Sequence, residues 1–124
     1  MATGFINLNV YQKAFELAMK IFEESKIFPK EEKYSLTDQI RRSSRSVCAN
    51  LAEAYRKRKY PPHFISKLTD ADMENTETQV WLKFSIACGY ASEESFSALS
   101  NDSKEIGRML DHMINNPEKF VRNW

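Results

Sequence analysis

The chain has 124 residues, which suits one domain with a hydrophobic core and is short for two. Hydrophobic residues make up 42% and charged residues 28%, proportions that exclude an intrinsically disordered chain. The 18 basic and 17 acidic residues leave a net charge of +1, so strong attraction to a polyanion would have to come from local clusters of charge.

No apolar run approaches the ~20 residues that a membrane-spanning helix requires, and the N-terminus lacks the basic and apolar segments of a signal peptide. Cys48 and Cys88 are isolated, without Cys-x-x-Cys spacing, as is typical of small buried or interface residues in a reducing compartment. We therefore expect a cytoplasmic protein with no membrane partner.

The first predicted helix covers about residues 8–26. It should end before Phe28-Pro29, because proline disfavours the helical conformation in the residue that precedes it. Apolar residues recur at three- and four-residue steps and predict its buried stripe, with Ala14 and Ile21 widening it: Leu8, Tyr11, Phe15, Ala18 and Phe22.

The second predicted helix covers about residues 31–58, and Pro61-Pro62 should end this segment. Glu31 and Glu32 suit the positive end of a helix dipole. The residues expected to face the core lie within a narrow arc at 100° per residue, with Ser43 at its edge: Leu36, Ile40, Ser44, Val47, Leu51 and Ala54.

Two further helices are predicted over about residues 63–88 and 92–115, with a short C-terminal tail at 117–124. Gly89 suits the end of the first of them, and Ser92 suits the start of the second. The short link between them favours antiparallel neighbours. The last helix has a regular apolar seam: Phe96, Leu99, Ser103, Ile106, Leu110 and Met113. The pattern predicts one domain over residues 1–124, an all-α antiparallel up-and-down four-helix bundle.

The second helix is strongly basic. Residues 39–60, QIRRSSRSVCANLAEAYRKRKY, carry seven arginines and lysines and one acid, Glu53. One interpretation is a solvated helix face, since Asp38 and Glu53 stand one turn before Arg42 and Lys57. The other is a nucleic-acid-binding surface, for which the candidate residues are Arg42, Arg56, Lys57, Arg58 and Lys59.

Arg41 and Arg45 share a flank of this helix with small residues that permit another helix to approach closely. Arginine pairs bidentately with carboxylates, and the third helix offers four of them. We therefore expect ion pairs, within the fold or at a subunit contact, between these two arginines and the following acids: Asp70, Asp72, Glu74 and Glu77.

The third helix is apolar on two sides. Its core face is predicted to hold Phe64, Leu68, Ala71, Leu82 and Ile86. A polar layer of Asn75, Thr78 and Gln79 interrupts that face, as a register-setting device or, alternatively, as a ligand site. A domain this small has too few internal neighbours to cover a second apolar face, so either the bundle is irregular or this face is a subunit interface. We expect an interface, formed by Met73, Val80, Trp81, Phe84 and Cys88.

Several chemistries have no residues to support them. A di-iron carboxylate bundle needs Glu-x-x-His, but Tyr60 and Met109 stand three residues before the two histidines, His63 and His112. No phosphate-binding glycine loop or nucleophile elbow is present. We expect no metal, no cofactor, no small-molecule substrate and no catalysis, unless the layer around Asn75 and Gln79 forms an unrecognised site.

Four stretches together resemble one protein family: LNVYQKAFELA, FPKEEKYSLTDQIRRSSRSVCANLAEA, DADMENTETQVWLKFSIACGYAS and IGRMLDHMINNPEKF. The chain resembles the four-helix-bundle proteins encoded within intervening sequences of bacterial 23S ribosomal RNA genes, which are related to the accessory protein of diversity-generating retroelements. The resemblance implies a ring-like homo-oligomer, with a pentamer favoured, and singles out Gln39, Arg41, Arg42, Asn50 and Glu53 as motif residues. The family commonly has glycine where this chain has Ala54, so we expect the second helix to continue into the RKRK segment.

Two functions remain open at this point. The first is a non-catalytic oligomeric bundle that binds structured RNA or a ribonucleoprotein through its clustered arginines and lysines. The second is a protein-interaction or structural scaffold with no nucleic-acid role, whose basic residues serve salt bridges and solubility.

Overall fold

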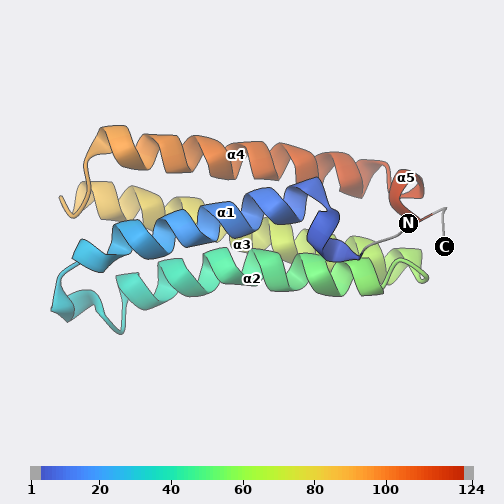
Figure 1. Cartoon of the computed structure of the whole chain (residues 1–124), viewed down its shortest axis with the longest axis horizontal. Helices are drawn as coiled ribbons and strands as arrows, with labels where there is room; N and C mark the ends of the chain where they lie inside the picture. The colour runs from blue at the N-terminus through green and yellow to red at the C-terminus, as the bar shows by residue number, and fades with distance from the viewer. Residues whose placement is uncertain (1–3, 122–124) are drawn as a thin grey trace.

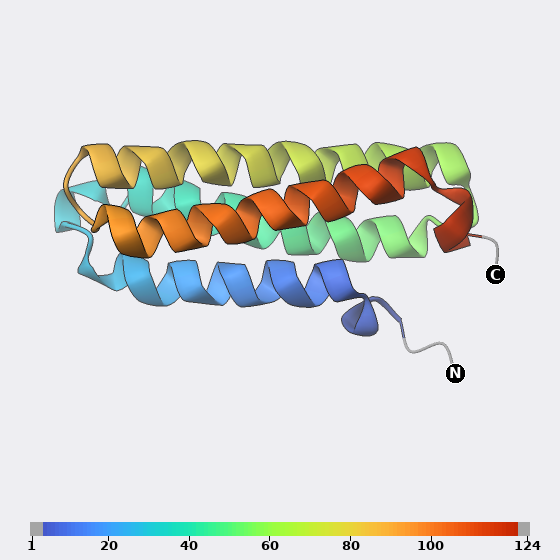
Figure 2. The same ribbon diagram turned by 90° about the horizontal axis from the view of Figure 1, so that it is seen from above.

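The computed structural model describes residues 4–121 and confirms the predicted all-α antiparallel bundle. Its long helices are α1 (Asn9–Glu24), α2 (Leu36–Arg56), α3 (Pro61–Ala87) and α4 (Glu93–Asn115), followed by the short α5 (Glu118–Val121). The chain runs up and down between the two ends of the bundle (Figure 1). Both α1 and α3 pack against α2 and α4, so that α1 and α3 lie diagonally opposite each other (Figure 2).

Helix α2 begins five residues later than expected, because a side chain upstream caps it. A 3₁₀ turn occupies Lys30–Glu32, and the Glu32 carboxylate accepts hydrogen bonds from the Ser35 hydroxyl (2.6 Å) and the Leu36 backbone N–H (3.2 Å). This satisfies an N–H group that has no partner within the helix. The Tyr90 hydroxyl also donates to Glu32 (2.7 Å), and this bond is the main reason that the pKa of Tyr90 is raised to about 12.

The other helix ends also differ from the predicted bounds. Helix α1 stops at Glu24 and a 3₁₀ turn follows at Ser25–Ile27. Helix α2 stops at Arg56 and does not continue through the basic segment, since residues 57–59 form a turn. Pro61 and Pro62 open α3, where a missing N–H costs nothing because first-turn donors have no intrahelical partner. Residues 122–124 of the expected tail lie outside the described residues.

The predicted core positions of α2 and α4 are all buried. The predicted stripe of α1 is confirmed at Ala14, Ala18 and Ile21, which are buried, and wrong at its aromatic positions. Phe15 is 52% exposed, and Tyr11 and Phe22 are only partly buried. The core is built instead from a narrower aliphatic stripe that allows α1 to approach its neighbours closely: Val10, Ala14, Leu17, Ala18 and Ile21. On α3 the expected core residues are buried except Ile86, which is partly buried against the core.

The predicted polar layer of α3 links three helices. Asn75 donates from Nδ2 to the Ser103 carbonyl on α4 (2.8 Å), and the Ser103 hydroxyl donates to Asn75 Oδ1 (2.9 Å). The Thr78 and Ser43 hydroxyls share a hydrogen bond of 2.8 Å between α3 and α2. Gln79 is only half-buried and stands outside this network. The space around the layer is too small for a water molecule, which favours the register-setting interpretation over a ligand site.

Replacing Asn75 by alanine should therefore destabilise the protein by about 1–3 kcal/mol, because both hydrogen bonds between its side chain and Ser103 are lost and the Ser103 hydroxyl keeps only the longer bond to the Asn75 carbonyl (3.3 Å). Urea denaturation followed by circular dichroism measures the change. The matched control is Asn101→Ala at an exposed position of α4. If Asn75→Ala were no more destabilising than this control, the layer would not determine the register.

Candidate functional site

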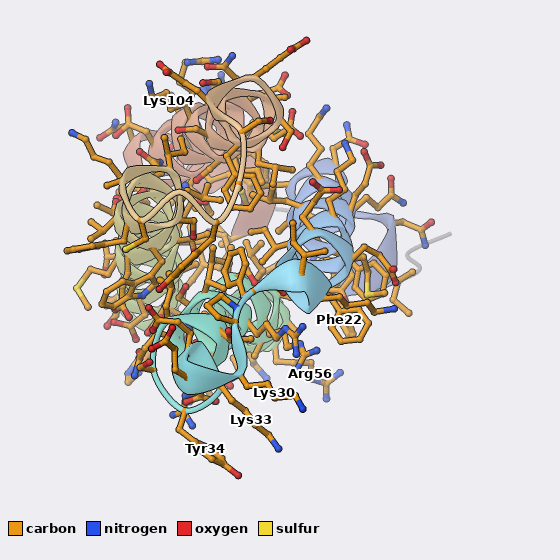
Figure 3. All side chains as sticks on the ribbon, turned by 90° about the vertical axis from the view of Figure 1, so that its left-hand side faces the viewer. Phe22, Lys30, Lys33, Tyr34, Arg56 and Lys104 are labelled. Carbon is orange, nitrogen blue, oxygen red and sulfur yellow. The ribbon has the colours of Figure 1, made fainter. Side chains whose placement is uncertain are left out.

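The cations of α2 and of the turn that follows it form an exposed basic surface, defined here as Arg42, Arg45, Arg56, Lys57 and Lys59. Between residues 4 and 121, no carboxylate lies within ion-pair distance of any of these five side chains. Viewed along the bundle, Arg56, Lys30 and Lys33 project from one side of the molecule (Figure 3). These charges are therefore available to an anionic partner.

Arg58 is held differently from its neighbours in sequence. Its guanidinium stacks on the Tyr55 ring at 3.5 Å, and its Nε donates to the Tyr55 carbonyl at 3.0 Å. It also lines a pocket of about 300 Å³ at the same end of the bundle as Lys119. Three cations of the predicted RKRK cluster, Arg56, Lys57 and Lys59, are therefore exposed. The fourth, Arg58, is held against Tyr55 near the end of α2.

Within the subunit, Arg41 does not pair with the carboxylates of α3, and its pairing at a subunit contact stays a prediction. Its Nε donates to the Ser25 hydroxyl (2.8 Å), its Nη2 approaches the Phe22 carbonyl (3.5 Å), and its guanidinium lies 4.8 Å from the Phe22 ring centre. Arg45 lies over the same ring at 5.6 Å, and so does Lys26 at 4.9 Å. The flank of α2 that carries both arginines faces α1, so neither reaches α3 within the subunit.

An ion pair does join α2 and α3, but its cation lies on α3 and its carboxylate on α2. Lys67 of α3 lies 2.7 Å from Glu53 of α2 and 3.8 Å from Asp70, and it donates to Asn50 Oδ1 at 3.2 Å. The hydrogen bond with Glu53 is the main cause of a raised pKa for Lys67. Glu53 and Asn50 of the family motif thus contact α3, whereas Gln39 borders a shallow pocket beside Trp81 and Phe84.

The other acids of α3 form no ion pair with an arginine within the described residues either. Glu77 accepts a hydrogen bond from the Trp81 indole at 3.1 Å. Partial burial is the largest cause of the raised pKa values of Asp72 and Glu74. The charge of Arg42 acts against this rise at Glu74, so these two groups are electrostatic neighbours without forming an ion pair.

The outer face of α3, defined as Met73, Val80, Phe84 and Cys88, is exposed in the subunit, and its role as a subunit interface stays a prediction. Met73 is 65% and Phe84 51% accessible, while Trp81 is partly buried with its ring 5.9 Å from that of Phe84. Lys83 is the only exposed lysine, arginine or carboxylate in α3, whose residues are all described. Low charge combined with aromatic and methionine side chains is typical of the centre of a protein–protein interface.

The structure also places the two thiols and the groups that could hold a metal ion. Cys48 and Cys88 are free, and burial raises the pKa of the Cys48 thiol to about 11, which makes it a poor nucleophile. Over residues 4–121, no group of three or more histidines, cysteines or carboxylates is placed to hold a metal ion. None of the helices in that range is both long and apolar enough to cross a membrane.

The family model described as 23S rRNA-intervening sequence protein matches residues 6–112. The chain belongs to this family. A solved structure from Bacteroides thetaiotaomicron, described as a protein with unknown function from the S23 ribosomal protein family, is similar with 34% identity and a TM-score of 0.78. The similarity covers 86% of this chain and 95% of that one, and none of the curated proteins matches. Neither description names a catalytic activity.

One feature of this family member was missed from the sequence. Tyr11, Phe15 and Met19 of α1 line a groove against α4, together with Leu99, and Phe15 and Met19 are exposed. The sequence does show that α1 carries apolar residues on more than one face, which indicates a second apolar surface. Helical spacing alone, however, assigned Tyr11, Phe15 and Phe22 to the core.

The structure separates the roles of the two arginines on the α1 flank. Arg41→Ala should destabilise the protein by about 1–2 kcal/mol, since it removes the hydrogen bond to Ser25 and the stacking on Phe22. Arg45→Ala removes the same charge but only the longer contact with that ring, and should cost below ~0.5 kcal/mol. Thermal or urea unfolding of the two variants makes the comparison, and equal losses would contradict the distinction.

Proposed function

We propose that this family member is a non-catalytic, self-assembling cytoplasmic protein that binds structured RNA or a ribonucleoprotein through the basic surface of α2. The observation that carries the proposal is the absence of ion-pair partners, over residues 4–121, for the five cations of that surface. Burial or ion pairing would make these side chains unavailable to an anionic partner, and neither occurs for these five cations within residues 4–121.

Self-assembly supports RNA binding despite the small net charge. A net charge of +1 gives one copy little long-range attraction to a polyanion. Several copies held together present the same basic surface repeatedly, and linked sites on one partner bind far more tightly than separate ones. The family resemblance favours a pentamer, and the outer face of α3 supplies an apolar surface for subunit contact.

The second candidate function is a protein-interaction scaffold without a nucleic-acid role. The outer face of α3 favours it, because an exposed low-charge face of this kind also suits a different protein partner. In that case the cations of α2 serve solubility, and binding to RNA is absent even at low salt.

The RNA proposal predicts a salt-dependent affinity. Fluorescence anisotropy with a structured ribosomal-RNA fragment, titrated at several salt concentrations, should give a linear fall of log K with log salt. Lys57→Ala/Lys59→Ala should weaken binding and make the slope shallower by about 1 for each phosphate that the variant no longer neutralises.

The matched control is Lys13→Ala/Lys104→Ala, which removes the same charge from α1 and α4, away from the basic surface. It should bind RNA nearly as the wild type does. Equal loss in the two double variants would show that only total charge matters, and no binding at low salt would favour the scaffold.

The assembly proposal predicts that Phe84→Glu lowers the mass of the protein to that of one 14.5 kDa chain, since a charge would be buried unpaired in the contact. Phe84 is half-exposed in the subunit, so the helix content should not change. Sedimentation velocity and circular dichroism measure the two quantities. Ile27→Glu, at an exposed apolar position outside α3, is the control and should keep the mass of the wild type. An unchanged mass for Phe84→Glu would remove the interface assignment.

A further inference from the structure

The turn between α2 and α3 combines exposed cations with an exposed aromatic ring. It lies at the end of the bundle that also holds α5 (Figure 1). Between Glu53 and Asp70 the chain has no aspartate or glutamate, while this stretch includes the four cations of residues 56–59. Glu53 itself is paired with Lys67 at 2.7 Å. The turn is therefore a local excess of positive charge in a chain whose net charge is only +1.

Tyr60 is exposed at a position where the helix makes no use of its side chain. It is the N-cap residue of α3, a position at which serine, threonine, aspartate or asparagine would stabilise the helix through a side-chain oxygen. The tyrosine makes no such capping hydrogen bond, and 56% of the residue is accessible. Its ring meets the His63 ring edge to face, with the ring centres 6.0 Å apart. A large flat ring is thus presented to solvent next to the cations.

The backbone around Tyr60 is well fixed. The Tyr60 N–H donates to the Lys57 carbonyl (2.8 Å), and the Tyr60 carbonyl accepts from the N–H groups of His63 (2.8 Å) and Phe64 (3.0 Å). The two prolines that follow restrict the chain further, because their rings lock the φ angle. A ligand of this turn would not have to order the backbone first, which lowers the cost of binding.

Duplex and unpaired RNA differ in what such a turn can contact. In a duplex the bases are stacked on one another, so a protein meets mainly phosphates and 2′-hydroxyls, for which lysines suffice. In a loop, a bulge or a single-stranded end the bases are accessible, and they stack on aromatic side chains while cations hold the neighbouring phosphates. An exposed tyrosine among lysines therefore adds affinity for unpaired nucleotides in particular.

We propose that the turn between α2 and α3 binds unpaired nucleotides of RNA, with one base stacked on the Tyr60 ring and the adjoining phosphates held by Lys57 and Lys59. The backbone hydrogen bond between Tyr60 and Lys57 keeps the first of these lysines close to the ring, and Lys59 is its neighbour in the chain. This inference rests on the proposed RNA binding and names the part of a structured RNA that this end of the basic surface contacts. The arginines farther along α2, Arg42 and Arg45, are left to contact phosphates of either kind of RNA.

The test uses one RNA strand of about 12 nucleotides, both unpaired and annealed to its complement, in fluorescence anisotropy at several salt concentrations. Tyr60→Leu keeps an apolar side chain but removes the flat ring. It should weaken binding of the unpaired strand by about 5- to 150-fold, the range for one lost base stack, and leave duplex binding within about twofold of the wild type. The salt slope should stay that of the wild type, since no phosphate contact is lost.

Two further variants serve as controls. Tyr60→Phe keeps the ring and should bind the unpaired strand as the wild type does, which separates stacking from loss of the hydroxyl. Tyr34→Leu removes a tyrosine that is 85% exposed near the other end of the bundle, in a segment that also carries Glu31 and Glu32, and should change neither affinity. Circular dichroism should show the helix content of the wild type for all three variants.

Three outcomes would overturn the inference while leaving RNA binding in place. Tyr60→Leu could bind the unpaired strand as tightly as the wild type does, which would show that no base stacks on the ring. It could weaken binding of the unpaired strand and of the duplex equally, which would make the tyrosine a structural part of the basic surface. Tyr60→Phe could lose as much affinity as Tyr60→Leu, which would assign the effect to the hydroxyl. A wild-type protein that binds neither RNA at low salt would instead overturn the proposed function itself.

Discussion

Asn75 and Ser103 exchange two hydrogen bonds across the contact between α3 and α4, and Thr78 and Ser43 share one across the contact between α3 and α2. An interior polar group that loses its partner costs about 1–3 kcal/mol, and this applies most to the Asn75 side-chain amide. The Ser43 and Thr78 hydroxyls also bond carbonyls of their own helices, so their mutual bond adds a smaller preference for the same register. The register also fixes the rotation of α3 about its own axis. With Asn75 and Thr78 inside, Met73, Val80 and Phe84 have to face outward.

The same constraint places the charges of α2. Because Ser43 and Ser44 are turned inward, Arg42 and Arg45 lie at the surface, and Arg41 reaches the end of α1. The acid on this helix that contacts α3, Glu53, is paired with Lys67. The helix therefore pairs one of its two carboxylates within the fold and leaves most of its cations in solvent, as the proposed RNA-binding surface needs.

The parts of the fold that could be predicted are those in which one helix carries a single apolar stripe. The core positions of α2 and α4 follow from spacing alone, because the rest of each helix is mostly polar or small and forms no second apolar stripe. Helix α1 is apolar on more than one face, and both of its possible stripes have helical spacing. Which stripe faces the core depends on how closely α1 approaches its neighbours, and Ala14 and Ala18 allow the closer approach.

The partner of Arg41 could not be predicted for a different reason. The acids on α3 were visible in the sequence, but an antiparallel bundle of four helices can turn in either direction. The direction decides whether a given flank of α2 meets α1 or α3. The capping of α2 by Glu32 could not be predicted either. A glutamate at this position fits the first turn of a helix as well as the capping position that it occupies.

Native mass spectrometry of the wild-type protein, alone and with a structured ribosomal-RNA fragment, tests the central claim most directly. We expect an assembly of several 14.5 kDa chains that keeps the same number of chains when RNA is bound. A single chain in both samples, with RNA unbound, would contradict both the assembly and the role of the basic surface.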